Sequence, residues 1–338
     1  MQPKFSILMP TYNHGAVIEE TIQSILDQDY DNFEIIVSIN GESSPYSIAM
    51  NNVTDERVKW QINPNYVNYG ENLFRAFQYA NGDHIIYFAS DDIMGSGCLS
   101  CYSSIVDATD SYGAILRTYF AFSDDVTVAV REKPRFQEAI REISIDSGSF
   151  EEIMLGFSTL DQLSGLCFPN PRSTPSASVD IFTCHAYPVL ESIMKSRKFH
   201  YVSDDFLAVR IGLSQSRTIS DIYDKSPMAS WNYFLDRIFV TQQDEKLRVF
   251  LKKYWIGSNI VGLFQITNFS KKPYKFLLRE VKVLLGNRPL YIFNPAFHLV
   301  FIMCVFLPKE ILIRVVDFCK ITLLRLTHRS IRGRGLRS

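Results

Sequence analysis

Two adjacent carboxylates, Asp91 and Asp92, directly follow an apolar run over residues 85–89. Burying an unpaired ion costs several kcal/mol, so such a pair is not expected inside a core. Carboxylate oxygens are the preferred ligands of Mg²⁺ and Mn²⁺, which are often held by only one or two of them. The pair therefore predicts a metal or ligand site where a buried strand ends. The alternative is a solvated turn or a helix cap.

The segments around this pair predict a layered α/β unit. Short apolar runs predict buried strands, and apolar positions on one face predict amphipathic helices. The expected strands are 5–10, 33–39, 58–63 and 84–90, and the expected helices are 16–28 and 72–80. Strands this apolar, separated by helices, predict a mainly parallel sheet with helices on both faces.

Three polar clusters follow strands of this predicted sheet. They are Thr11–His14, Asn40–Ser44 and Ser90–Asp92. In open parallel sheets, ligands bind at the carboxyl ends of the strands. We therefore expect the two aspartates to lie in a ligand site that the other two clusters share.

The order of these motifs resembles a known family. The segments SILMPTYN, SILDQDY, NFEIIVS and NYGENLFRAFQYANGDHIIYFASDD occur in family-like order over about residues 4–95. They resemble the family 2 glycosyltransferases of the GT-A fold, most closely the branch that builds bacterial O-antigen and capsule sugars. The resemblance implies a Rossmann-like, mainly parallel sheet that binds a nucleotide-diphosphate sugar.

The resemblance also implies a reaction and a cofactor. Members transfer a sugar, with inversion, from the nucleotide donor to a lipid-linked saccharide or a polysaccharide acceptor. By resemblance Asp92 is the ligand of a divalent cation, Mn²⁺ or Mg²⁺, and Asp91 holds the ribose or the metal shell. A cation that bridges the diphosphate would stabilise the charge that develops as the nucleotide leaves.

The donor pocket follows from the same motifs. Pro10, Thr11 and Tyr12 would line the base and the ribose. Asn68 and Asn72 are either donor-pocket residues or structural caps.

Two positions depart from the family pattern. Ile39 stands where a base-reading Asp is expected, so Asn40 or Glu42 would take over that role. Ala89 stands at the first position of the usual Asp-x-Asp motif.

An inverting transfer needs a general base to take the proton of the acceptor hydroxyl. The segment 163–168 looks like the strand that precedes this base in the family. Asp180 is the first choice downstream of it and His185 the second. Asp161 and the pair Asp204–Asp205 remain open, although the pair is also typical of a hairpin turn within 199–212.

The second half of the chain has a weaker pattern. Segments 136–143, 150–157 and 188–197 favour helices, as does most of the chain from about 228. We expect a GT-A domain over 1–225, with a donor half (1–95) and an acceptor half (96–225). A helical, basic C-terminal region over 226–338 would follow.

Charge is divided unevenly along the 338 residues, although the formal net charge is only −1. Residues 251–338 hold 16 Lys and Arg against 3 Asp and Glu. Residues 296–308 are apolar but shorter than the roughly 20 residues of a membrane-spanning helix, and 310–326 are amphipathic with basic polar positions. The segment 296–326 therefore predicts an interfacial anchor on anionic lipid. A helical hairpin packed on the body is the alternative.

The sequence begins without a signal-peptide pattern, and its cysteines lack zinc-site spacing. We expect a cytoplasmic protein, held peripherally at the inner face of the membrane. Nucleic acid is not an expected partner, because the basic tail is interleaved with Leu, Ile and Val and not with stacking aromatics.

Two rival functions remain at this stage. One is a non-catalytic GT-A subunit of a polysaccharide assembly with a degraded donor site, which the departures at Ile39 and Ala89 favour. The other is a nucleotidyltransferase, but residues 11–20 lack its Gly-rich basic loop.

Overall fold

A computed structural model of the chain describes residues 4–315, apart from 110, 124, 128, 130, 174–179, 181 and 212–225. The described residues fall into two compact units, 4–211 and 226–315. The catalytic motifs expected from the sequence all lie in the first unit. Residues 316–326 of the expected anchor lie outside the described residues.

The described part of the first unit contains two sheets. The larger has the strand order β3-β2-β1-β4-β10-β6-β11-β9, and the smaller has the order β5-β12-β7-β8. The strands are β1 (Phe5–Thr11), β2 (Phe33–Asn40), β3 (Val58–Asn63), β4 (His84–Tyr87), β5 (Ile93–Met94), β6 (Ile115–Arg117), β7 (Phe120–Phe122), β8 (Arg131–Glu132), β9 (Ile140–Ser144), β10 (Cys167–Pro169), β11 (Lys198–Val202) and β12 (Leu207–Arg210).

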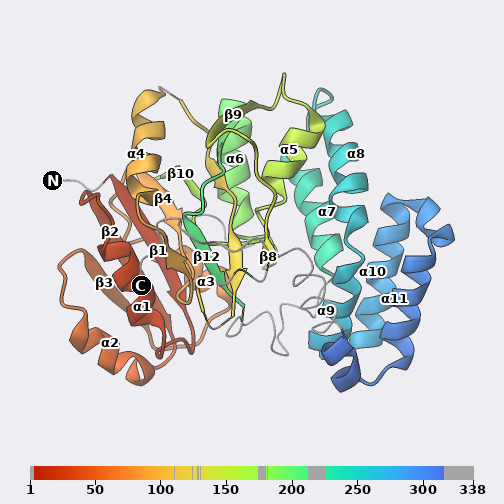
Figure 1. The fold of residues 1–338 in the computed structure, drawn as a ribbon, viewed down its shortest axis with the longest axis horizontal. Helices are drawn as coiled ribbons and strands as arrows, with labels where there is room; N and C mark the ends of the chain where they lie inside the picture. Colours follow the sequence, from red (N-terminus) through yellow and green to blue (C-terminus); the bar gives the residue numbers. More distant parts are fainter. Residues whose placement is uncertain are drawn as a thin grey trace. The chain divides into compact units, whose positions relative to one another are not determined.

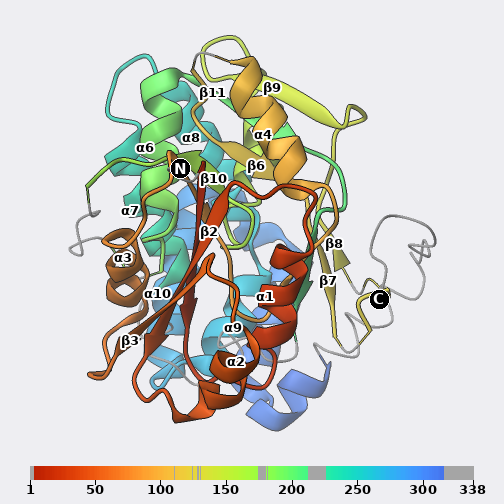
Figure 2. The same cartoon turned by 90° about the vertical axis from the view of Figure 1, so that its left-hand side faces the viewer.

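Helices cover both faces of the larger sheet. They are α1 (Ile18–Leu26), α2 (Ser47–Asn52) with a preceding 3₁₀ turn η1 (Ser44–Tyr46), α3 (Tyr69–Phe77), α4 (Cys98–Ala108), α5 (Phe150–Phe157) and α6 (Ala186–Ser196). Figures 1 and 2 show α1 and α4 on one side of the strands and α3 and α6 on the other. This confirms the predicted α/β architecture with a mainly parallel sheet, in which β9 and β10 are the antiparallel strands of the larger sheet.

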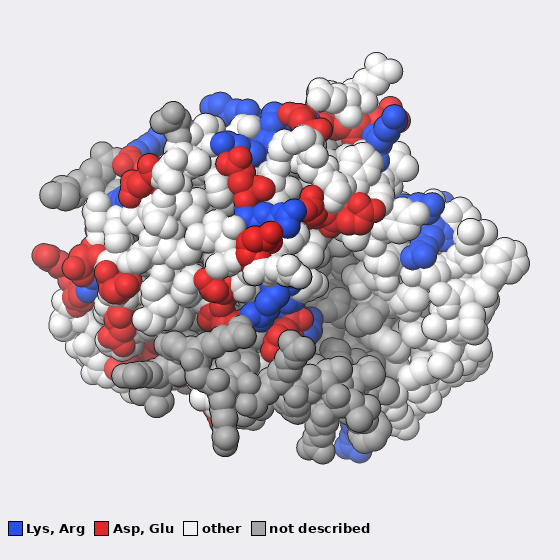
Figure 3. All heavy atoms as spheres, turned by 45° about the horizontal axis from the view of Figure 1, so that its top comes forward, with Lys and Arg blue, Asp and Glu red and all other residues white. Residues whose placement is uncertain are grey.

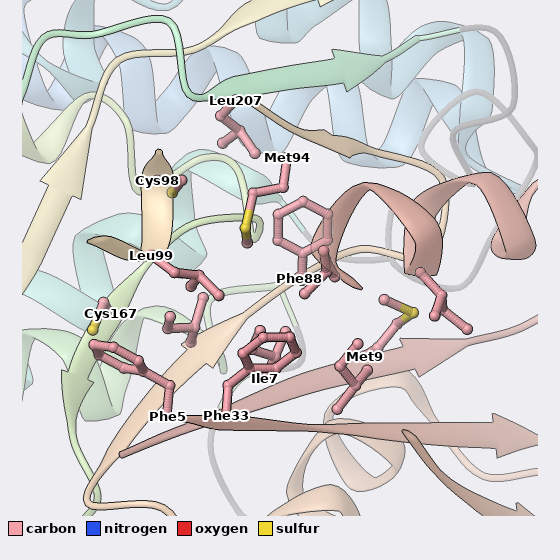
Figure 4. Close-up of a cluster of buried hydrophobic side chains, with 14 of the residues drawn as sticks. Phe5, Ile7, Met9, Phe33, Phe88, Met94, Cys98, Leu99, Cys167 and Leu207 are labelled. Carbon is pink, nitrogen blue, oxygen red and sulfur yellow. The ribbon is translucent and has the colours of Figure 1, made fainter. Parts of the chain in front are cut away.

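The alternation of side chains along β1 explains the two layers. Phe5, Ile7 and Met9 point to one face and pack in a core with side chains from α1 and α4 (Figure 4). On the opposite face, the ring of Phe77 from α3 meets Tyr87 with ring centroids 5.9 Å apart. Both faces of the parallel strands are therefore buried, which explains why their sequences are nearly continuous apolar runs.

The second half of the larger sheet corrects two predictions. The helix expected over 136–143 is wrong, because residues 140–144 form β9, which pairs antiparallel with β11. Residues 204 and 205 do not turn a hairpin, because β11 pairs with β6 and β9 whereas β12 pairs with β5 and β7. In both places pairing with distant strands decides the structure, and local periodicity cannot show it.

The second unit is helical in its described residues. Its helices are α7 (Pro227–Ile238), α8 (Glu245–Tyr254), η4 (Ile256–Ser258), α9 (Val261–Phe269), α10 (Pro273–Asn287), η5 (Pro289–Phe293) and α11 (Pro295–Phe306). The carboxyl group of Glu280, on α10, accepts hydrogen bonds from Ser226 Oγ and, at 3.0 Å, from the Met228 amide at the start of α7. Within 4–315, the described helices are each too short or too polar to cross a membrane.

Candidate functional site

Strand direction brings the polar clusters to one edge of the sheet. Strands β1, β2, β3 and β4 are mutually parallel, and Thr11 lies opposite Ile39 in the register of β1 and β2. Strand β10 is antiparallel to both β4 and β6, and β11 is parallel to β6. The segments that follow β1, β2, β4 and β11 therefore emerge at the same edge, and the last of these contains Asp204.

Asp92 is held on both carboxylate oxygens by protein donors. Its Oδ2 accepts hydrogen bonds from Ser164 Oγ at 2.6 Å and Gln162 Nε2 at 2.9 Å, and its Oδ1 accepts one from the Arg210 amide at 2.9 Å. The residue is 1% exposed. Burial raises the pKa of Asp92 well above its ordinary value, and the neighbouring charge of Asp91 raises it further. Asp92 therefore fixes the loop that carries the pair.

Asp91 has different surroundings. Its Oδ1 lies 4.0 Å from His14 Nδ1, and that ring nitrogen also lies 2.9 Å from Ser90 Oγ. Burial raises the pKa of Asp91, and the charges of His14 and Arg210 oppose this effect. No hydrogen bond from another residue's side chain engages the Asp91 carboxylate among the described residues. Of the two carboxylates, Asp91 is therefore the one that can turn to a ligand.

Arg210 connects the smaller sheet to this loop. Its Nε donates to the Asp91 carbonyl oxygen at 3.0 Å, and its Nη2 lies 2.6 Å from Glu20 Oε2. Its guanidinium also lies over the Phe122 ring, 4.6 Å from the centroid. The charge of Arg210 is thus shared between its ion pair with Glu20 and the carboxylate of Asp91.

The loop that holds Asp92 depends on a buried arginine. Arg117 is 1% exposed and donates to the carbonyl oxygens of Ser164 (2.6 Å), Thr159 (3.0 Å) and Gln162 (2.8 Å). Burial lowers the pKa of Arg117. Gly165, in the same loop, has φ +79°, and a Cβ there would lie 3.0 Å from Arg117 Nε.

Three expected donor-pocket asparagines are engaged inside the fold. Asn40 exchanges two hydrogen bonds with the backbone of Val67, at 2.8 and 3.0 Å. Asn68 caps α3 by accepting from the Glu71 amide at 2.9 Å. Asn72 is 3% exposed and bonds to the Ser38 carbonyl and hydroxyl. The structure thus gives all three a structural role.

The residues expected to bind the nucleotide base lie at the ends of β1 and β2, at the carboxyl edge of the larger sheet. Pro10 and Thr11 are buried at the end of β1, and Thr11 Oγ1 lies 3.0 Å from Tyr46 Oη. Tyr12 is exposed, and its ring meets that of Tyr66 with centroids 5.2 Å apart. Glu42 is exposed beyond the end of β2. The two exposed aromatic rings in contact make a surface on which a base could stack.

The two preferred general bases differ in accessibility. His185 is buried, its Nε2 lies 2.7 Å from the Leu160 carbonyl oxygen, and burial lowers its pKa. Asp180 is partly exposed and its Oδ1 accepts from the Phe182 amide at 2.8 Å. Residues 174–179 and 181, on either side of it, lie outside the described residues.

The remaining carboxylates that the sequence offered as general bases also differ in their partners and exposure. Asp161 accepts from Tyr119 Oη at 3.0 Å and pairs with Lys133 Nζ at 2.8 Å. Asp205 pairs with Arg135 at 2.8 Å and its side chain is 4% exposed. Asp204 is exposed, and its carboxylate makes no hydrogen bond or ion pair with the described residues.

The sequence did not indicate which residues hold Asp92 by hydrogen bonds. Gln162, Ser164 and Arg210 lie 70 to 118 positions after Asp92, and no local motif marks them. His14 belongs to the cluster Thr11–His14 that was already expected at this edge, whereas Tyr66 lies in a polar segment between two predicted elements.

The carboxylates of Asp91 and Asp92 could supply part of the coordination shell of a divalent cation. The described residues contain no group of three or more His, Cys, Asp and Glu side chains arranged to hold a metal ion. Mg²⁺ commonly takes only one or two carboxylates and completes its shell with phosphates and water. Two adjacent buried carboxyl groups with raised pKa values would also be relieved by a cation. Asp91 therefore fits as a direct ligand of the cation, and Asp92 fits as the residue that fixes the loop carrying Asp91.

Comparisons with known proteins agree with this geometry. The model of the family "Glycosyl transferase family 2" matches residues 6–156. A GalNAc(5)-diNAcBac-PP-undecaprenol beta-1,3-glucosyltransferase of Campylobacter jejuni is 34% identical over 101 residues, 29% of this chain and 33% of the relative. The UDP-Glc:alpha-D-GlcNAc-diphosphoundecaprenol beta-1,3-glucosyltransferase WfgD of Escherichia coli is 33% identical over 88 residues, 26% of this chain and 35% of the relative. These matches span about a third of the length of the curated relatives.

A solved structure shares the fold over most of the chain. S. aureus TarS 1–349 in complex with UDP-GlcNAc superposes with a TM-score of 0.56 at 15% identity, covering 86% of this chain and 92% of that one. At this identity the likeness shows the fold alone. The GT-A architecture expected from the sequence is thereby confirmed.

Proposed function

We propose that this chain, which carries a family 2 glycosyltransferase domain over residues 6–156, moves a sugar from a nucleotide-diphosphate sugar to an acceptor hydroxyl with inversion. The observation that supports it is the Asp91–Asp92 loop. It lies at the carboxyl edge of the parallel strands, the same edge at which β1 ends just before the exposed Tyr12. The proposed acceptor is a lipid-linked saccharide or a polysaccharide of the cell surface, and the names of two matched relatives give an acceptor linked to undecaprenol through a diphosphate.

In the donor site the two aspartates have different roles. Asp91 binds the cation or the ribose, because its carboxylate is the less engaged of the two. Asp92 orients it, because three protein donors already hold the Asp92 oxygens. This reverses the order that the sequence resemblance implies. A bound Mn²⁺ or Mg²⁺ would supply positive charge to a leaving diphosphate.

The base of the nucleotide lies against Tyr12 in this proposal. Asn40 is held on both amide atoms by Val67, so Glu42 is the better residue to read the base. Ile39 is buried in the core and takes no part.

For the general base we keep Asp180 and, from the pair Asp204–Asp205 that the sequence left open, Asp204. A general base must reach the acceptor hydroxyl directly or through one water. His185 is buried and bonded to a carbonyl oxygen, so it is the weakest choice. Asp204 is exposed and follows β11 at the same edge as Asp91.

The location follows from the acceptor. A lipid-linked acceptor lies at a bilayer, so a chain that uses one works at the membrane surface. We propose the cytoplasmic face, where nucleotide sugars are made.

Calorimetric titration with UDP, GDP, CDP and dTDP, each with and without Mn²⁺, tests the donor site. We expect metal-dependent binding of one nucleotide, lost in Asp91→Asn. The matched control is Asp83→Asn, an exposed carboxylate before β4 at the opposite edge of the sheet.

The results separate the two functions. Binding that survives Asp91→Asn would remove that residue from the site. Absence of binding by every nucleotide, in a chain shown to be folded, would favour the non-catalytic subunit with a degraded donor site.

A further inference from the structure

The second unit exposes an unusual set of large apolar side chains at η5 and α11. We call it the η5–α11 surface, and it consists of Leu290, Ile292, Phe293, Leu299, Ile302 and Phe306. Phe293 is 81% exposed and Phe306 is 76% exposed. Leu299, Ile302 and Phe306 are spaced three and four residues apart and so share one face of α11. Single exposed apolar residues are ordinary, but several on one helix face indicate an interaction site.

Apart from His298, helix α11 consists of apolar residues. Residues 289–308 contain no Asp, Glu, Lys or Arg. Only Phe297 and Cys304 of α11 are buried among the described residues. A helix of a water-soluble unit normally keeps its outer face polar, so a helix like this one needs a second apolar environment.

Basic residues flank this surface in the sequence, and α10, which contacts η5, carries more of them. Arg288 precedes it and Lys309 follows it, and α10 with the turn before it adds further cations. Those on α10 and its turn are Lys271, Lys272, Lys275, Arg279 and Lys282. In Figure 3 the atoms of this unit that face the viewer are mainly uncharged, with a small cluster of Lys and Arg.

We propose that the η5–α11 surface inserts into the boundary between headgroups and acyl chains of an anionic bilayer. An apolar face with flanking basic residues is the pattern of interfacial helices. At 12 residues α11 is shorter than the roughly 20 needed to cross the bilayer, so it lies in the interface. The inference goes beyond glycosyl transfer and does not depend on it.

The charge of the basic residues favours a bilayer over a second copy of the chain or residues 316–338 as the occupant of this surface. A two-fold contact between two copies would bring the same flanking basic residues together. Residues 316–338 carry Asp317 against Lys320, Arg325, Arg329, Arg332, Arg334 and Arg337, so they too would place cations beside cations. Anionic headgroups complement these cations, with each basic residue contributing on the order of 1 kcal/mol.

Co-sedimentation of the full chain with vesicles tests the proposal. One set contains phosphatidylcholine with phosphatidylglycerol, and the other contains phosphatidylcholine alone. The test variant is Phe293→Gln with Phe306→Gln, and both side chains are exposed, so the fold should tolerate the change. The control is Ile48→Gln with Val240→Gln, which removes apolar side chains that are 71% and 73% exposed elsewhere.

We expect binding to the anionic vesicles that weakens with salt, and a partition coefficient roughly tenfold lower or more in the test variant. The control variant should bind as the unaltered chain does. Equal binding by the test variant would overturn the proposal. So would a concentration-dependent dimer that the same two changes dissolve, because it would assign the surface to a second copy. Nucleotide titration of the test variant shows whether its donor site is intact. A change in vesicle binding can therefore be distinguished from a failure of the donor site.

Discussion

Removing the hydroxyl of Ser164 should loosen the loop that carries Asp91 and Asp92. Ser164 is fully buried, and its Oγ accepts from the Ala89 amide at 2.7 Å while donating to Asp92 Oδ2 at 2.6 Å. It therefore joins the end of β4 to the carboxylate. Ser164→Ala deletes both bonds at once and leaves the Ala89 N–H without its partner.

The size of the effect can be worked from these two bonds. A hydrogen bond to a charged group contributes about 1.5–3 kcal/mol, and leaving a buried donor unpaired costs about 1–3 kcal/mol. Part of this is recovered, because Asp92 keeps its bonds from Gln162 and Arg210. We expect a local loss of about 2–4 kcal/mol, which is a factor of about 30 to 1,000 in the opening equilibrium.

Hydrogen exchange of the full chain, followed by mass spectrometry, measures this directly. The amides of residues 87–92 should exchange faster by the factor given above, while β2 should be unchanged. Ser158→Ala is the matched control, since its hydroxyl donates only to the Leu155 carbonyl oxygen after α5. Protection of residues 87–92 that stays within about threefold of the unaltered chain would refute the reasoning.

Three further outcomes are expected. Burial raises the pKa of Glu280 from 4.5 to about 7, so the folded state binds the extra proton and stability should fall by about 3 kcal/mol as pH rises from 4.5 to 7. Glu280→Gln should abolish that slope in melting curves, and a slope that persists would contradict the assignment. Gly165→Ala should lower the melting temperature through about 1–3 kcal/mol of strain, because φ is positive and the new Cβ meets Arg117; an unchanged melting temperature would show that the loop relaxes freely. Tyr66→Ala should weaken nucleotide binding by about 1–3 kcal/mol without changing the melting temperature, and equal affinity in calorimetry would place the base away from Tyr12 and Tyr66.

The edge of the sheet at which the candidate site lies was predictable from local sequence. The runs that form β1, β2 and β4 are apolar because both of their faces are covered, and this pattern is visible without the fold. Parallel strands separated by helices have one common carboxyl edge, so the positions of Thr11 and Asp91 followed from strand order. The helices α1 and α3 were likewise predicted from the spacing of their apolar residues.

The assignment of roles within the site was not readable from the sequence. Asp91 and Asp92 are chemically identical and adjacent, and only the distant donors Gln162, Ser164 and Arg210 distinguish them. The same holds for Asn40, Asn68 and Asn72, since an amide that caps a helix and an amide that binds a ligand are the same residue in a sequence.

The sequence by itself thus determined the elements whose signal is local: buried strands, amphipathic helices, and the charge asymmetry of the second half. Tertiary structure decided what depends on contacts between distant residues. It made residues 140–144 a strand, because β11 offered an edge to pair with. It also gave the Asp92 carboxylate three donors and left the buried Asp91 carboxylate without a side-chain donor from the described residues, because hydrogen-bond partners are set by the packing of segments that lie far apart in the chain.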